Sequence, residues 1–189
     1  PAHDLTLSAV AAGAGGYDLN HMLNGVTSST YYSYPAYLAF VLMSYNNTYE
    51  WNKPLDYFFQ KRYADALAKY MNGNYSGSTI NSQLTTDVTK LFAPDFYAGL
   101  SVPGRETQLK EALQNNTVVG WKTTLPVRLY HGSRDEIIPY QNSEVTLSGF
   151  REAGSTDVSL KIIPAGTHGS SFLPMLQDFV PWFLEIGTE

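Results

Sequence analysis

The last third of the sequence alternates short apolar runs with longer amphipathic ones. The runs "LPVRLYH" (125–131) and "DVSLKIIPA" (157–165) have the length and apolar character of buried strands. A helical pattern follows each of them, at 140–154 and at 170–186. The order strand, helix, strand, helix is typical of a parallel sheet with crossover helices. We therefore expect an α/β fold in this part of the chain.

The beginning of the chain contains one further candidate strand. In "LTLSAVAAGAGGYDL" (5–19), a β-compatible run of small residues breaks into a glycine-rich turn, which predicts a strand at 5–12. This strand has no charge, proline or bulge signal to protect an open edge. We therefore expect residues 1–15 to be covered by a second copy of the chain, by the chain's own helices, or by a separate N-terminal fragment.

Between these parts, from about residue 31 to 120, the pattern is helical. A proline at the first helical turn and a glycine at the stop predict one helix between Pro54 and Gly73. Three further helices are expected in "YPAYLAFVLMSY" (34–45), "SQLTTDVTKLF" (82–92) and "ETQLKEALQNN" (106–116). We therefore expect this part of the chain to be mainly helical. The tyrosine-rich stretch 31–49 suits either the core of this helical part or the lining of an apolar pocket.

Composition excludes several classes of function. The net charge of −5 and the lack of any Lys/Arg cluster argue against nucleic-acid binding. No run of eighteen apolar residues is present, so we expect no membrane span. The absence of cysteine excludes disulfides and thiolate chemistry. No His/Asp/Glu cluster has metal-ligand spacing, and we expect neither a metal nor another cofactor. The many Tyr, Asn, Ser and Thr residues are compatible with a secreted or periplasmic bacterial protein.

Two chemistry-bearing side chains follow the last two predicted strands. Asp135 follows the strand at 125–131, and His168, in "PAGTHGSS", follows the strand at 157–163. The exit loops of adjacent parallel strands lie side by side at the carboxyl edge of a sheet. A carboxylate that orients a histidine general base makes up two thirds of a nucleophilic triad. We expect a carboxylate oxygen of Asp135 within about 3.2 Å of Nδ1 of His168.

These segments resemble a known family. "LPVRLYHGSRDEIIPYQNSE", "VSLKIIPAGTHGS" and "FLPMLQDFVPWF" look like the C-terminal part of an α/β-hydrolase of the esterase/lipase or prolyl-oligopeptidase-like type. The resemblance implies that Asp135, in the strand-HG-x-x-D-x-x-[VI]-P stretch, is the catalytic acid and that His168 is the catalytic histidine. It also implies a hydrolase core at 1–19 and 121–189, with residues 20–120 as a helical cap or lid.

The nucleophile of that family is not recognisable in this sequence. The family's serine precedes the acid and the histidine on a G-x-S-x-G elbow. No serine before Asp135 has glycines at both of these positions, and Ser101, in "GLSVP", has only the preceding Gly99. We therefore interpret the chain as the C-terminal half of a serine hydrolase acting on a small-molecule ester or a peptide. The nucleophile and the oxyanion-hole donors would lie outside it, so this fragment alone is expected to be inactive.

Several alternatives remain open at this point. Asp18, in "GGYDL", also follows a predicted strand and is either a rival acid or a helix cap. Asp135 alone would suit a turn carboxylate that caps the next helix, and His168 alone would suit an exposed loop. His131 is expected to satisfy local backbone groups, whereas His3 and His21 suggest no role.

A second class of function also fits the sequence. A non-catalytic domain could keep the hydrolase fold and bind a partner or a ligand instead. A G-x-S-x-G motif in sequence upstream of Pro1 would favour the enzyme over the binding domain.

Overall fold

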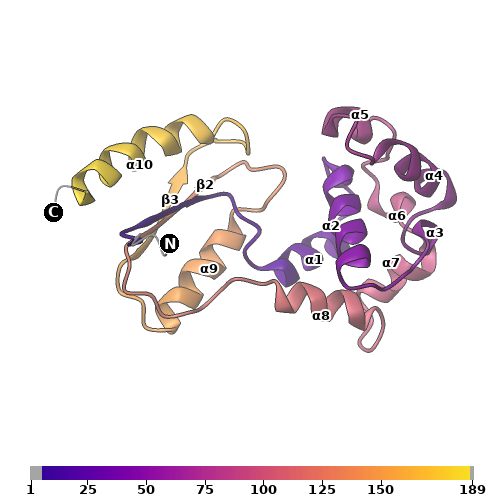
Figure 1. Cartoon of the computed structure of the whole chain (residues 1–189), viewed down its shortest axis with the longest axis horizontal. Coiled ribbons are helices and arrows are strands. Elements are labelled where there is room, and N and C mark those ends of the chain that lie inside the picture. Colours follow the sequence, from indigo (N-terminus) through magenta and orange to yellow (C-terminus); the bar gives the residue numbers. More distant parts are fainter. Residues whose placement is uncertain (1–5, 188–189) are drawn as a thin grey trace, which may run out of the picture. The chain divides into compact units, whose positions relative to one another are not determined.

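The computed structural model describes residues 6–187 and divides the chain into two compact units (Figure 1). The first unit comprises the residues up to Met22 and those from Thr117 onward, and the second comprises Leu23–Asn116. Helix α1, Leu19–Ser28, spans the first boundary. The roles of core and cap that we assigned to 1–19, 121–189 and 20–120 stay predictions.

The first unit is built on three parallel strands. They are β1 (Val10–Gly13), β2 (Val127–Gly132) and β3 (Val158–Ile163), in the order β1-β2-β3. Val127 pairs with Val10 on one side and with Val158 on the other. β2 and β3 are paired neighbours, and the chain between them contains one helix. They therefore form a parallel crossover unit. The predicted α/β fold is confirmed.

Helices α9 (Gln141–Glu152) and α10 (Phe172–Ile186) cover opposite faces of this sheet (Figure 1). Side chains alternate between the two faces along a strand, so one set of β2 residues meets each helix. The face toward α9 forms a buried cluster of Val127, Leu129, Phe150 and Val158. Helix α9 stops just before Gly154, whose φ of +92° is readily adopted only by glycine.

The other face of the sheet holds α10 through a charged cluster. Asp178 on α10 accepts hydrogen bonds from the Tyr130 hydroxyl at 2.7 Å and from the Arg128 guanidinium at 3.2 Å. Lys161 also binds this carboxylate and lowers its pKa. Burial, with the bond to Asp178, raises the pKa of Tyr130 to about 12. The Arg128 guanidinium lies 4.1 Å from the ring centre of Trp182, and this contact adds a cation–π attraction.

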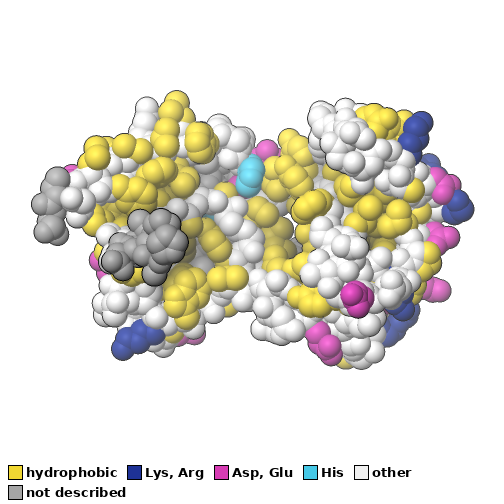
Figure 2. All heavy atoms as spheres, viewed as in Figure 1, with side chains coloured by type: hydrophobic (Ala, Val, Ile, Leu, Met, Phe, Trp, Pro, Cys, Tyr) yellow, Lys and Arg dark blue, Asp and Glu magenta, His cyan; other side chains and the backbone are white. Residues whose placement is uncertain are grey.

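The outward face of α10 is apolar and exposed. Figure 2 shows hydrophobic side chains gathered over this helix. They include Phe172, Leu173, Val180, Phe183 and Leu184, of which Leu184 is 68% exposed. An exposed apolar patch of this kind is typical of a surface that packs against further protein.

A buried asparagine ties the loop after β1 to α9. Oδ1 of Asn142 accepts hydrogen bonds from the backbone N–H groups of Tyr17 at 2.9 Å and Asp18 at 3.1 Å. Its Nδ2 donates to the carbonyl of Asp18 at 2.8 Å. One side chain therefore satisfies three backbone groups that lie far from it in the sequence.

Asn142→Ala is expected to lower the free energy of unfolding by about 2–3 kcal/mol, because these partly buried backbone groups lose their partners. Gln141→Ala removes an exposed neighbour on the same helix and should change stability by less than about 0.5 kcal/mol. Urea unfolding of both variants measures the difference. Equal losses in the two variants would contradict this role of Asn142.

The second unit is helical around an aromatic core. Rings of Phe58, Phe59, Phe92 and Phe96 contact one another with centroids 5.2–6.3 Å apart. Its helices after α1 are α2 (Pro35–Thr48), α3 (Leu55–Phe58), α4 (Lys61–Tyr70), α5 (Gly77–Asn81), α6 (Val88–Leu91), α7 (Pro94–Leu100) and α8 (Thr107–Asn115).

Two helix predictions in this unit are wrong. The single helix expected between Pro54 and Gly73 is broken at Phe59, whose backbone is extended and forms a bridge with Phe92. Both rings are buried, so the pairing outweighs the local preference for helix. The helix expected over 82–92 is reduced to α6. The residues before α6 form a bridge and a cap instead, because Asp87 pairs with Tyr31 and accepts a hydrogen bond from the Thr89 N–H.

The first strand also differs from the prediction. It begins at Val10 rather than at residue 5, and β2 is its only strand partner among the described residues. Residues 1–5 lie outside the described part of the chain, so association through residues 1–15 stays a prediction. Within residues 6–187, no helix has both the length and the apolar character needed to cross a membrane.

Candidate active site

The loop after β2 fixes the carboxylate of Asp135. Its Oδ1 accepts hydrogen bonds from the N–H groups of Ile137 at 2.9 Å and Ile138 at 2.8 Å. The Asp135 N–H donates to the carbonyl of Gly132 at 3.2 Å, which closes the turn at the strand end. The side chain is fully buried. Oδ1 therefore caps the turn by accepting backbone hydrogen bonds, as expected for a turn carboxylate. Oδ2 is left to accept a hydrogen bond from another group.

The loop after β3 is fastened to the loop after β2 by three hydrogen bonds. The Ala165 N–H donates to Oγ of Ser133 at 2.8 Å. The Arg134 N–H donates to the carbonyl of Gly166 at 2.9 Å. The His168 N–H donates to a carboxylate oxygen of Glu136 at 3.2 Å. The two loops that carry Asp135 and His168 are thus held side by side.

Within this frame the two predicted side chains meet. Nδ1 of His168 lies 2.8 Å from Oδ2 of Asp135, inside the expected limit of about 3.2 Å. The carboxylate can only accept, so Nδ1 carries the proton and Nε2 is left as the basic nitrogen. The His168 side chain is 37% exposed, whereas that of Asp135 is 0% exposed. A partly exposed imidazole that is oriented by a buried carboxylate can act as a general base toward a hydroxyl group.

Solved structures resemble this chain over almost its whole length. A protein of Legionella pneumophila described as a candidate hydrolase matches 97% of the chain with a TM-score of 0.79 and 25% identity. The rice cell wall degrading esterase LipA from Xanthomonas oryzae matches 91% of it with a TM-score of 0.74 and 23% identity. The chain has an α/β-hydrolase fold. It covers only 49% and 47% of those two chains, about half of their length.

No protein-family model matches the chain, and no curated protein sequence matches it.

The close approach of the two loops of this hydrolase fold depends on glycine. A Cβ atom at Gly132 would lie 2.3 Å from the carbonyl oxygen of Gly166 and 2.3 Å from Oγ of Ser171. Both distances are well inside van der Waals contact, so a side chain at Gly132 would push the β3 loop away. Ser171 in turn donates its hydroxyl to the carbonyl of Thr167 at 2.6 Å, beside His168.

The other sequence candidates have different places in the hydrolase fold. Asp18 accepts a hydrogen bond from the His21 N–H at 2.9 Å at the start of α1, as a capping residue does. The partner of His168 Nδ1 is Asp135 and not Asp18. Ser101 follows α7 in the second unit. His3 lies outside the described residues.

Sequence reasoning missed the polar residues that support the pair. Ser133 and Glu136 flank Asp135 in the sequence but bind backbone groups of the neighbouring loop. No pattern in the sequence marks such contacts, although serine and acidic residues next to a strand-exit carboxylate are candidates for them. In the part of the chain that the structure describes, no three His, Asp or Glu residues are arranged to hold a metal ion.

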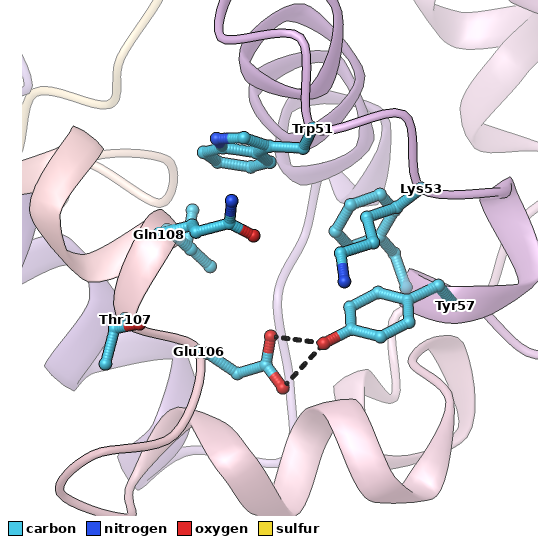
Figure 3. Close-up of a pocket in the computed structure, with 8 residues that line it drawn as sticks. Trp51, Lys53, Tyr57, Glu106, Thr107 and Gln108 are labelled. Atoms are coloured by element: carbon cyan, nitrogen blue, oxygen red, sulfur yellow. Dashed lines mark hydrogen bonds between the residues drawn. The ribbon is translucent and has the colours of Figure 1, made fainter.

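A separate pocket of about 130 Å³ lies within the second unit (Figure 3). The Tyr57 hydroxyl donates toward both carboxylate oxygens of Glu106, at 3.0 and 3.2 Å, while Trp51 and Gln108 line the pocket beside them. Burial and the bond to Glu106 raise the pKa of Tyr57. None of the site residues predicted from the sequence lines this pocket.

Proposed function

We propose that this chain supplies the acid and the histidine of a serine hydrolase that cleaves carboxylic esters. His168 is the general base and then the general acid, Asp135 orients it, and the nucleophilic serine lies outside this chain. The observation that carries the proposal is the 2.8 Å hydrogen bond between Asp135 and His168, formed between the loops that leave two adjacent parallel strands.

The chemistry proceeds by acyl transfer. As the serine oxygen bonds to the carbonyl carbon of the ester, its proton passes to Nε2 of His168. The imidazolium so formed is stabilised by the carboxylate of Asp135. Collapse of the tetrahedral intermediate breaks the bond to the leaving alkoxide, which takes the proton back from Nε2. Water then releases the acid from the acyl-enzyme by the same sequence of proton transfers.

The preference for an ester substrate follows from the structural relatives. LipA is an esterase by its description, and the Legionella pneumophila protein is described as a candidate hydrolase. A peptide bond requires the same groups, so peptide substrates belong in the tests. The helical second unit is proposed as the cap that covers the substrate.

Two surfaces of the first unit support the proposal that a further segment packs against it and completes the fold. β1 has a strand neighbour on one side only among the described residues, and the outward face of α10 is apolar and exposed. Both features are unfavourable in an isolated α/β unit. The chain also spans only about half of the hydrolases it resembles.

The proposal is tested with this chain alone and with the chain extended by its upstream sequence. The extended protein should hydrolyse p-nitrophenyl esters and react covalently with a fluorophosphonate probe at a serine in the added part. The chain alone should hydrolyse the esters no faster than free imidazole, because it has neither nucleophile nor oxyanion hole.

Ser101→Ala serves as the control and should change nothing. If the chain alone is an efficient esterase and loses that activity with Ser101→Ala, the nucleophile has been placed wrongly. If the extended protein contains no serine that the probe labels, the enzyme proposal fails and the non-catalytic binding domain is favoured.

A further inference from the structure

A second histidine lies directly behind the acid. His131 is the second-to-last residue of β2 and is fully buried. Its Nε2 lies 2.8 Å from the carbonyl oxygen of Ile138 and 3.4 Å from Oδ2 of Asp135. Its Nδ1 lies 2.6 Å from Oγ of Ser143 on α9. Asp135 is therefore placed between two imidazole rings, those of His131 and His168.

The partners of His131 determine its tautomer. The Ile138 carbonyl can only accept a hydrogen bond, so Nε2 of His131 carries a proton. Ser143 is also fully buried, and among the described residues its hydroxyl has no other hydrogen-bond partner. If Nδ1 carried a proton as well, the buried hydroxyl hydrogen of Ser143 would be left without an acceptor. Ser143 therefore donates to Nδ1, which makes His131 the neutral Nε2–H form.

This arrangement stabilises the turn that carries the acid. Ile138 is held on two sides, because its N–H donates to Oδ1 of Asp135 and its carbonyl accepts from His131. His131 is in turn held by Ser143 on α9. The neutral ring also leaves the charge of Asp135 for His168, whereas a cationic ring 3.4 Å from Oδ2 would compete for it.

We propose that His131, held by Ser143 in the neutral Nε2–H form, is a positioning residue that fixes Asp135 for His168. The catalytic consequence rests on the proposed function, but the positioning itself concerns only this chain. His131 is expected to contact no substrate.

The first test is nitrogen-15 NMR of the 189-residue chain at pH 7, with labelled histidine rings. In the unaltered chain, the His131 ring should show one protonated nitrogen, Nε2, and one unprotonated nitrogen, Nδ1. In Ser143→Ala the Nδ1 signal of His131 should move because this nitrogen loses its hydrogen-bond donor, and the Nδ1–H signal of His168 should weaken by exchange. Ser148→Ala changes an exposed serine on the same helix and should leave both rings as they were.

The second test uses the extended protein and separates kcat from KM. His131→Phe, which removes both ring nitrogens, should lower kcat by about 10–100-fold with little change in KM, as is typical when the hydrogen-bond partner that orients a metal-binding side chain is removed. His131→Gln keeps one donor and one acceptor and should recover part of that loss. Ser143→Ala should lower kcat by about 10-fold.

The outcomes separate the two proposals. A His131 ring protonated at Nδ1 in the unaltered chain overturns the positioning proposal. So does Ser143→Ala if it matches Ser148→Ala in both the His168 signal and kcat. An inactive extended protein whose His131 ring has the expected pattern would refute the hydrolase function and leave the placement of Asp135 intact. Because Ser143→Ala removes a single oxygen, it keeps the test decisive if His131→Phe fails to fold.

Discussion

His168→Ala in the extended protein is expected to lower kcat/KM for p-nitrophenyl esters by about 10⁴-fold or more. In the proposed mechanism this imidazole, held by Oδ2 of Asp135 at 2.8 Å, takes the proton from the nucleophile and returns it to the leaving group. The measurement is a steady-state assay at pH 8 together with a fluorophosphonate labelling rate, which should fall in parallel.

The matched control is His21→Ala. His21 is a partly exposed histidine on α1, and its only hydrogen bond to Asp18 uses the backbone N–H. The His21→Ala variant should keep at least half of the activity of the unaltered protein. A His168→Ala protein that retains more than about a tenth of the activity would rule out the triad assignment.

Asp135→Asn is expected to lower kcat by about 10⁴-fold while the fold is retained. The amide oxygen can still accept from the Ile137 and Ile138 N–H groups, so the turn survives. The amide nitrogen then takes the place of Oδ2 and presents hydrogens to Nδ1 of His168. Nδ1 must accept, Nε2 becomes protonated, and the histidine can no longer act as a base.

Glu136→Gln is the matched control for this change. Glu136 is the neighbouring acid and accepts the His168 N–H, which a glutamine oxygen can also accept. Its kcat should remain within a few-fold of the unaltered protein. Circular dichroism and urea unfolding of both variants show whether the fold is kept. A folded Asp135→Asn protein with normal kcat would remove Asp135 from the mechanism.

The part of the fold that carries the site was predictable because its signals are local. Two apolar runs with a helical segment between them predict adjacent parallel strands, and the residue types at their exits predict a carboxylate–histidine pair. The adjacency of the loops that carry Asp135 and His168 follows from that topology. The same topology does not indicate the contact with Ser143, which hydrogen bonds to His131 from the first turn of α9.

The helical unit was harder to predict because tertiary contacts override its local preferences. The segment from Pro54 to Gly73 has an unbroken helical pattern, yet Phe59 leaves the helix to pair with Phe92. The gain from burying both rings together exceeds the small difference in helix propensity. No feature within that segment identifies its distant partner.

The two chain crossings between the units have a consequence for how the length of the second unit can vary. The Leu19 N–H donates to Oγ1 of Thr117 at 3.1 Å, and the Val118 N–H donates to the carbonyl of Tyr17 at 2.7 Å. The chain thus leaves the sheet-bearing unit and returns to it at the same place. Since loop-closure entropy grows only with the logarithm of loop length, each doubling of the connecting segment adds only about 0.6 kcal/mol to the cost of closing it. We therefore expect that residues 23–116 can be lengthened, shortened or exchanged without moving Asp135 or His168.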